Sequence, residues 1–303
     1  MKRIILFVVL LTLVSCSGGR KKVKEGELSG DITLSGAFAL YPLAVKWAEE
    51  FRILHPGVRI DISAGGAGKG MTDVLAGVVD LGMVSREVYP AELEKGAVAF
   101  AVAKDAVVPT INAANPNLDA LLKTGLTREK AAKLWSDEKS SEFNVYTRSD
   151  ACGAAETWAL WFGKKQEDLG GTAVFGDPGV AQAVQRDELA IGFNNLSYAY
   201  DETTRLPNEG LLVLPLDVND NGQVDEDERF YNTKDDIIQA IAAGKYPSPP
   251  ARDLYLVAGS APMTPVLKEF LRFVLTDGQQ YNIPSGYISL SEDKLKAGLN
   301  KLQ

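Results

Sequence analysis

Three stretches of this chain share one design, in which a short apolar run leads into a turn of very small residues and then into a helix-like pattern. The turns lie at residues 35–39, 65–70 and 148–154. The start of a helix carries unpaired backbone N–H groups and the positive end of the helix dipole. Several such starts that converge would hold a small oxyanion. We therefore expect an anion-binding protein, although side-chain hydroxyl groups are scarce in these turns.

The order of the elements around these turns predicts an α/β fold. Strand-like and helix-like patterns alternate near the start of the chain, at residues 32–34, 40–51, 58–62, 71–78 and 80–84. Such an order is typical of a parallel sheet that binds ligands at the carboxyl ends of its strands. The later part of the chain repeats the alternation, with expected elements at residues 126–130, 145–158, 180–187, 189–193 and 266–276.

Two further segments predict connections between two domains. The apolar run at residues 97–111 is long enough for a strand that crosses from one domain to the other. Residues 246–250 contain three prolines and break regular structure, and a return strand is expected at 253–257. The 276 residues after residue 27 (303 − 27) also favour two domains over one.

The first residues have the pattern of an export signal. Two basic residues precede an apolar run at 4–14, which is too short for a membrane span. Residues 13–16 (LVSC) resemble the bacterial lipobox, which predicts a signal peptide at 1–15 and a lipidated Cys16, followed by a small and charged tether up to residue 27. The alternative is a short membrane anchor with an incidental cysteine. We expect a protein attached to membrane lipid through Cys16 on the extracytoplasmic face of a bacterial membrane, in the periplasm or at the cell surface.

The charge and the few cysteine and histidine residues argue against several classes of protein. The formal charge of −8 becomes −10 (−8 − 2) once Lys2 and Arg3 are removed, and an acidic surface argues against nucleic acid as a partner. With Cys16 committed to lipid, Cys152 is the only other cysteine, so no disulfide framework is expected within one chain. His55 is the only histidine, which argues against a His-dependent triad or a zinc site.

Several short segments follow one another in a specific order and spacing. They lie at residues 36–43 with 46–48, 63–70, 80–86, 126–127 with 134–135, 148–150, 190–193 and 273–275. Together they resemble the phosphate-binding proteins of bacterial ABC phosphate transporters, within the bilobed periplasmic-binding-protein superfamily. The resemblance covers nearly all of the mature chain.

This resemblance implies an α/β protein of two lobes, each a mostly parallel sheet flanked by helices, with a hinge of crossing strands. Lobe 1 would comprise residues 28–107 plus 252–303, and lobe 2 residues 108–251. It further implies a monomer that is not an enzyme and needs no cofactor. Such a protein binds phosphate or a related oxyanion between its lobes and delivers it to an ABC permease. The alternative is a sensor or adaptor of the same superfamily that binds another small molecule or a protein partner.

The resemblance also carries a set of ligand positions onto this sequence. They are Ala37, Phe38, Ala39, Gly66, Ala67, Gly68, Ser85, Arg86, Arg148, Asp150, Cys152, Gly153 and Ala154. Members of the family usually have hydroxyl side chains where this chain has Ala37, Ala67 and Cys152. We therefore expect a site that depends on backbone N–H groups and on Arg148, which Asp150 would hold in place. Lys69 and Arg86 are the candidate replacement cations, or else ordinary solvated charges.

Residues 217–228 match the calcium-loop pattern D-x-N-x-N-G-x5-E. The ligands would be Asp217, Asn219, Asn221, Gln223, Asp225 and Glu228, with Gly222 at the sharp turn. The preceding apolar residues resemble a strand and not the helix of an EF-hand, so we expect a structural calcium ion in an EF-like loop of lobe 2. The alternative is an acidic surface turn rich in Asn and Gly.

Cys152, at an expected helix start, raises a catalytic alternative, because the pKa of a thiol falls at such a position. No histidine lies near it in the sequence, and the resemblance makes it a residue that lines the cleft. A cleft enzyme that uses Cys152 is therefore the weakest of the interpretations. Trp47, Trp158 and Trp161 occur at helical spacing and are predicted to be core residues.

Overall fold

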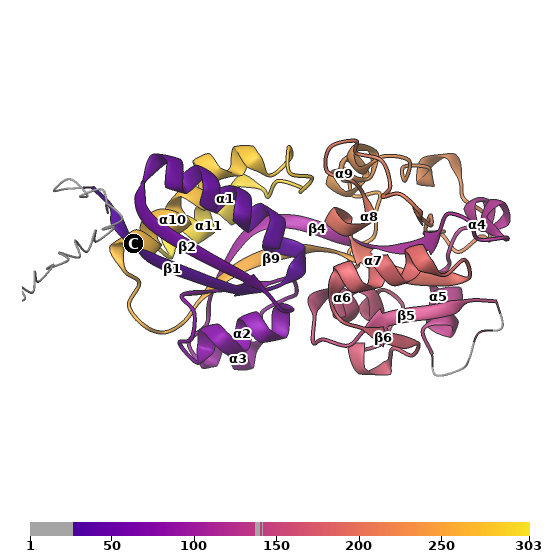
Figure 1. Ribbon diagram of the computed structural model, residues 1–303, viewed down its shortest axis with the longest axis horizontal. Coiled ribbons are helices and arrows are strands. Elements are labelled where there is room, and N and C mark those ends of the chain that lie inside the picture. Colours follow the sequence, from indigo (N-terminus) through magenta and orange to yellow (C-terminus); the bar gives the residue numbers. More distant parts are fainter. Residues whose placement is uncertain (1–26, 137–139, 141) are drawn as a thin grey trace, which may run out of the picture.

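Two long strands join the two lobes of the molecule (Figure 1). The computed structural model describes residues 27–136, 140 and 142–303, so the predicted signal peptide and Cys16 lie outside the described residues. Strands β4 (Val98–Asn112) and β9 (Ala251–Ala258) pair antiparallel along the connection. The prediction of two crossing strands is confirmed.

The ladder between these strands contains one irregularity. Its register shifts between Ala101 and Ala103, which leaves Val102 as the extra residue of a β-bulge. The carbonyl oxygen of Val102 instead accepts hydrogen bonds from Gln279 Nε2 at 2.9 Å and Asn282 Nδ2 at 3.2 Å. Side chains near the end of the chain thus satisfy the backbone at the bulge.

Lobe 1 is built from both ends of the described chain. Its elements are β1 (Ser29–Gly36), η1 (Phe38–Leu40), α1 (Tyr41–Leu54), β2 (Gly57–Ala64), α2 (Ala67–Leu75), β3 (Leu81–Val84), α3 (Pro90–Glu94), α10 (Pro265–Leu275), η4 (Asp277–Tyr281) and α11 (Glu292–Asn300). Strands β2, β1 and β3 are parallel, and β3 is antiparallel to β9. Figure 1 shows α1, α10 and α11 on one side of these strands and α2 and α3 on the other.

Lobe 2 is built from the middle of the chain. Its elements are α4 (Leu118–Thr124), α5 (Arg128–Leu134), β5 (Asn144–Arg148), α6 (Gly153–Trp161), η2 (Gln166–Asp168), β6 (Thr172–Val174), α7 (Gly176–Arg186), β7 (Ala190–Asn195), α8 (Leu196–Ala199), β8 (Leu211–Val213), η3 (Glu226–Glu228) and α9 (Lys234–Ala242). Strand β5 is parallel to β6 and β7, whereas β7 and β8 are antiparallel to β4.

The strands form one mixed sheet that runs through both lobes. Its order is β2-β1-β3-β9-β4-β7-β5-β6, and β8 also pairs with β4. The predicted two-lobed α/β fold is therefore confirmed, with parallel strands inside each lobe and antiparallel pairs at the crossing. None of the helices in the described part of the chain has the length and apolar character that a membrane crossing requires.

Two helices begin where the sequence rules place them. Pro42 lies in the first turn of α1, and the Thr127 hydroxyl caps α5 by accepting a hydrogen bond from Lys130 N at 3.1 Å. Helix α2 differs, because it ends at Leu75 and not at residue 78 as predicted. Gly77 with φ +68° follows it, and Val78 is left 69% exposed.

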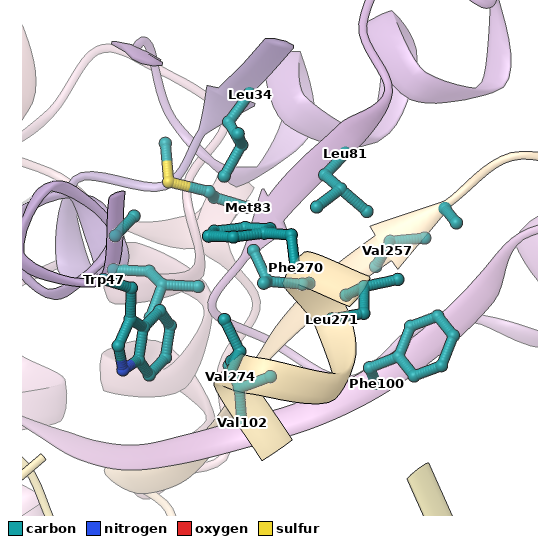
Figure 2. Packing of buried hydrophobic residues seen from close by; sticks show 14 of the residues in the cluster. Leu34, Trp47, Leu81, Met83, Phe100, Val102, Val257, Phe270, Leu271 and Val274 are labelled. Carbon is teal, nitrogen blue, oxygen red and sulfur yellow. The ribbon is translucent and has the colours of Figure 1, made fainter. Parts of the chain in front are cut away.

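The buried hydrophobic residues divide between the lobes. One cluster belongs to lobe 1, where Trp47 packs beside Phe270 and its neighbours on α10 (Figure 2). A second cluster belongs to lobe 2, where the rings of Trp135 and Trp158 lie 5.1 Å apart in an edge-to-face arrangement. Trp47, Trp158 and Trp161 are all buried, so their predicted place in the core is confirmed.

Candidate functional site

The three small-residue turns do converge, and they meet across the boundary between the lobes. The amide of Gly68 at the start of α2 donates to the carbonyl oxygen of Ala151, just before α6, at 3.0 Å. A Cβ atom on Gly66 would lie 2.7 Å from Asp150 Oδ2, and one on Gly153 would lie 2.1 Å from the carbonyl oxygen of Ser85. The two lobes therefore approach each other closely enough that only glycine fits at these positions.

Phe38 occupies the space between the first turn and lobe 2. Its ring lies 5.8 Å from that of Phe175 and 6.4 Å from that of Tyr198, both edge to face. The Tyr198 hydroxyl donates to the carbonyl oxygen of Phe38 at 3.3 Å. A Cβ atom on Gly176 would come within 2.9 Å of the ring. Phe38 thus packs against lobe 2 across the boundary between the lobes.

The small residues of the three turns are also buried, and some of their amides are already paired. Ala37, Ala39, Ala67 and Ala154 have exposures of 1% or less. The amide of Ala37 donates to the carbonyl oxygen of Met83 at 2.8 Å. The expected cradle of free N–H groups is therefore partly used by the protein itself.

Arg148 lies at the centre of this contact region. It donates to Asp150 through Nε at 2.9 Å and Nη2 at 2.7 Å, so the predicted pair is present and is bidentate. Its Nη1 also donates to Asp177 Oδ2 at 2.5 Å. Its guanidinium carbon lies 5.5 Å from the centre of the Phe38 ring. The side chain is only 1% exposed.

The electrostatics of this cluster are unusual for an anion site. Burial alone would lower the pKa of Arg148, but the charges of Asp177 and Asp150 more than offset this and raise it. One guanidinium and two carboxylates carry a net charge of −1 (+1 − 2). The cluster therefore holds Arg148 charged but offers no uncompensated positive charge to a ligand.

Three buried polar residues near the turns were missed from the sequence. Asp177 accepts hydrogen bonds from Asn195 N at 2.9 Å and Asn195 Nδ2 at 2.7 Å. Arg252 on β9 donates through Nε to the carbonyl oxygen of Ser85 at 2.9 Å and through Nη2 to Asn195 Oδ1. The signals were present in the sequence, because Asp177 follows a glycine at a fourth strand-to-helix turn and Arg252 interrupts an apolar strand.

Asp105 on β4 is a fourth missed residue. It is fully buried, and its Oδ2 lies 3.9 Å from Arg252 Nη2. Burial raises the pKa of the Asp105 carboxyl to about 6, although the Arg252 charge acts in the opposite direction. The crossing strands thus carry a buried ionisable pair directly behind the turns.

Lys69 and Arg86 both have carboxylate partners. Lys69 pairs with Asp73 one turn further along α2, away from Arg148. Arg86 donates to Glu92 Oε1 at 2.7 Å and Oε2 at 3.0 Å, and its guanidinium lies over the ring of Tyr89. Neither residue therefore supplies a free positive charge to the turns in this arrangement.

Cys152 has the environment of a structural thiol. Its sulfur accepts a hydrogen bond from the amide of Ala155 at 3.4 Å and so caps α6. Burial raises the pKa of Cys152 to about 12, and the nearby Arg148 charge offsets only part of this effect. The thiol is therefore protonated at neutral pH, and the geometry gives no support to a nucleophilic role.

The predicted calcium loop is held by its own hydrogen bonds. Buried Asp217 accepts from the amides of Asn221 at 3.1 Å and Gly222 at 2.6 Å. Asp225 accepts from the side-chain amides of Asn219, Asn221 and Gln223, and Glu228 accepts from the amide of Asp225 at 3.0 Å. Within the residues that the structure describes, no three His, Cys, Asp or Glu side chains are grouped to hold a metal ion. Calcium binding stays a prediction.

Comparison with known proteins places the fold in a family. A family model, the PBP superfamily domain, matches residues 23–278. The chain belongs to this superfamily. It is 26% identical over 362 residues to the phosphate-binding protein PstS of Methanocaldococcus jannaschii, an alignment that covers 97% of this chain and 92% of the relative. It is also 26% identical over 291 residues to the PstS protein of Bacillus subtilis, covering 92% and 87% of the two chains.

A solved structure shows the same arrangement of elements. The ABC-type phosphate transport receptor from Vibrio cholerae superposes with a TM-score of 0.61 at 20% identity, and the match covers 86% of this chain and 100% of that one. At this identity the likeness concerns the fold.

This PBP-superfamily protein also has a cavity of about 790 Å³ beside the converging turns. The crossing strands contribute Lys104 and Arg252 to its lining, lobe 1 contributes Arg86 and Tyr89, and lobe 2 contributes Glu156 and neighbouring residues of α6. Gly68, Ala151 and Cys152 of the converging turns line it as well, so the cavity lies between the lobes and against the predicted site. The three charged side chains of the Arg148 cluster are not among its lining residues.

Proposed function

We propose that this protein is an extracytoplasmic substrate-binding protein that binds phosphate or a related oxyanion and delivers it to an ABC permease. The observation that carries the proposal is Arg148, an almost fully buried guanidinium where turns from both lobes meet. Membership of the PBP superfamily and the similarity to proteins named PstS support the same role. No chemical reaction is part of the proposal.

Binding requires the lobes to separate first. We propose lobes of 28–107 plus 252–303 and of 108–251. The separate buried clusters support this division except at Ala106, Val107 and Ile288, which pack in the cluster of lobe 2. Phe38 comes from lobe 1 and Arg148 from lobe 2, so opening would remove the ring from the guanidinium. An oxyanion would then contact Arg148 and the backbone N–H groups of the turns, and closure would exclude water and strengthen each of these hydrogen bonds.

Isothermal titration of the mature protein with phosphate, sulfate, tungstate and molybdate tests the proposal. We expect heat of binding with at least one of these anions. The Arg148→Lys variant keeps the charge but loses the bidentate geometry, so it should bind that anion at least ~10-fold more weakly. Arg186→Lys, at an exposed position on α7, is the matched control. The absence of binding by all four anions would refute the proposal.

Attachment to the membrane is a separate part of the proposal. We propose that Cys16 is acylated after cleavage, that residues up to 27 hold the lobes away from the lipid, and that the protein acts as a monomer beside its permease. Labelling with radioactive palmitate should mark the wild type and not the Cys16→Ser variant. Label on both proteins, or on neither, would contradict the lipid anchor.

We also propose a structural calcium ion in the loop at 217–228. The loop already has the sharp turn at Gly222, with φ +90°, and Asp217, Asp225 and Glu228 stand at the carboxylate positions of the pattern. Calcium would replace the hydrogen bonds that these carboxylates accept within the loop. Calcium should raise the melting temperature of the wild type, and the Asp217→Asn variant should lose most of this response. Equal responses in both proteins would refute calcium binding at this loop.

A further inference from the structure

The Arg148 cluster leaves little room for a ligand when the lobes are closed. Both carboxylates of the cluster remain on Arg148, and Phe38 covers its face. The amide of Gly68 is engaged across the boundary. A closed complex with a ligand larger than a single small ion therefore needs another volume between the lobes.

The cavity beside the cluster provides such a volume. Its size of about 790 Å³ falls within the usual range of ~300–1,000 Å³ for small-molecule sites. Inorganic phosphate has only five non-hydrogen atoms and would leave most of this space to water. The volume instead suits an organic molecule.

Two cations on the crossing strands are available to a ligand. Lys104 on β4 has no ion-pair partner among the residues that the structure describes. Arg252 on β9 contacts Ser85, Asn195 and Asp105, yet its Nη1 is buried and has no hydrogen-bond partner in the described chain. An unpaired guanidinium N–H in a buried side chain is costly. A shift of the Arg252 side chain toward the cavity would let a ligand oxygen accept from it.

Two other cations of the lining have carboxylate partners, whereas Lys165 lines the cavity without an ion-pair partner among the described residues. Lys294 pairs with Asp253, and Arg86 pairs with Glu92 and with Glu156. Lys104 and Lys165 are thus the lining cations that no described carboxylate pairs, and Arg252 has only the more distant Asp105 as its partner. The carboxylates of Glu87 and Glu167 also line the cavity. A ligand with one negatively charged group at one end fits this distribution.

Other parts of the lining are less polar. It includes Leu160, which is 50% exposed, Tyr89, which is 43% exposed, and Pro249. An organic body that covered these side chains would remove apolar surface from water. The cavity thus offers both charged and apolar side chains to the same molecule.

We infer that this cavity binds a small organic anion, whose carboxylate or phosphate monoester lies at Lys104 and Arg252 and whose body packs against Tyr89 and Leu160. This ligand is additional to the oxyanion at Arg148, and its binding does not depend on the proposed function. Carboxylate and phosphate monoester share the oxyanion chemistry that the two cations recognise.

Native mass spectrometry and isothermal titration of the mature protein test this inference. The probes are inorganic phosphate, glycerol 3-phosphate and succinate, which separate the inorganic ion from the two kinds of organic anion. We expect at least one organic probe to bind to wild type, and Lys104→Ala to weaken its binding roughly 10-fold or more, because a charged hydrogen bond is lost. Lys245→Ala, at an exposed lysine outside the cavity, should bind as wild type does. Arg252→Gln should also weaken binding. If the Arg252→Gln protein does not fold, Lys104→Ala still tests the inference.

The outcomes separate this inference from the proposed function. Binding of inorganic phosphate without either organic probe would overturn the inference and leave the proposed function standing. Binding of an organic probe without any inorganic oxyanion would support the inference and count against the proposed function. Organic binding that Lys104→Ala leaves unchanged, or that Arg148→Lys abolishes while Lys104→Ala does not, would place the ligand elsewhere and overturn the inference.

Discussion

Gly153 at the start of α6 is the position where a single methyl group should hold the lobes apart. Its Cβ atom would lie 2.1 Å from the carbonyl oxygen of Ser85, which belongs to the other lobe. The obstacle is backbone, so no side-chain rotation relieves it. Within its own lobe the change is harmless, because alanine is a better helix former than glycine. Gly153→Ala should therefore oppose closure without destabilising lobe 2.

The structure sets the size of the effect. Real Cβ atoms essentially never come within 3.0 Å of such an atom, so the lobes must separate by at least 0.9 Å (3.0 − 2.1) at this point. The hydrogen bond from Gly68 N to Ala151 O would lengthen from 3.0 Å to 3.9 Å (3.0 + 0.9), which is beyond hydrogen-bond range. The bond from the Tyr198 hydroxyl to Phe38 O, now 3.3 Å, would be lost as well. At ~1 kcal/mol each, these losses amount to ~2 kcal/mol, or ~30-fold in the closure equilibrium.

Small-angle X-ray scattering measures closure directly. We expect Gly153→Ala to have a larger radius of gyration than wild type in the presence of a bound oxyanion, and a correspondingly weaker affinity by titration. Gly179→Ala is the control, because its Cβ atom would meet only the Val174 side chain within lobe 2, at 2.8 Å. Scattering curves and affinities that match wild type would refute the idea that these glycine contacts define the closed state.

Three other predictions concern buried ionisable side chains. Arg148→Gln leaves the carboxylates of Asp150 and Asp177 buried without their cation. Urea denaturation should therefore show a loss of ~3–5 kcal/mol in the free energy of unfolding, and a loss below ~1 kcal/mol would contradict this. Cys152, with its pKa at about 12, should react with Ellman's reagent at pH 8 only after unfolding in a Cys16→Ser background, whereas rapid reaction of the folded protein would show an accessible thiolate. The Asp105 carboxyl, with a pKa of about 6 instead of 3.8, binds its proton more tightly in the folded state, so its contribution to stability falls as pH rises from about 4 to 6. The stability of wild type relative to Asp105→Asn should therefore drop by up to ~3 kcal/mol between pH 4 and pH 7, and a difference that does not change with pH would refute the shift.

Local sequence signals were sufficient for the framework of this protein. The apolar run at residues 97–111 predicts a crossing strand because it is long enough to pass from one domain to the other. Strand β4 occupies Val98–Asn112, as predicted. The pairing of Arg148 with Asp150 was also predictable, since alternate residues after a strand lie on one side of the chain. These features depend on near neighbours in the sequence.

The composition of the site depends on distant parts of the chain and escaped prediction. Asp177 reaches Arg148 from the start of α7, 29 residues further on, and Arg252 reaches Ser85 across 167 residues. The sequence predicts which helix or strand carries each of these charged residues, but not which turn its side chain contacts. The contact of the Phe38 ring with Phe175 of lobe 2 was not predicted either, whereas the role of Phe38 as a ligand-contact residue stays a prediction.

The bulge at Val102 ties the crossing strands to the last part of the chain. Val102 lies outside the ladder of β4 and β9, and Gln279 and Asn282 of lobe 1 donate to its carbonyl oxygen. Residues that follow the last strand of the sheet therefore hold the backbone of a strand that continues into lobe 2.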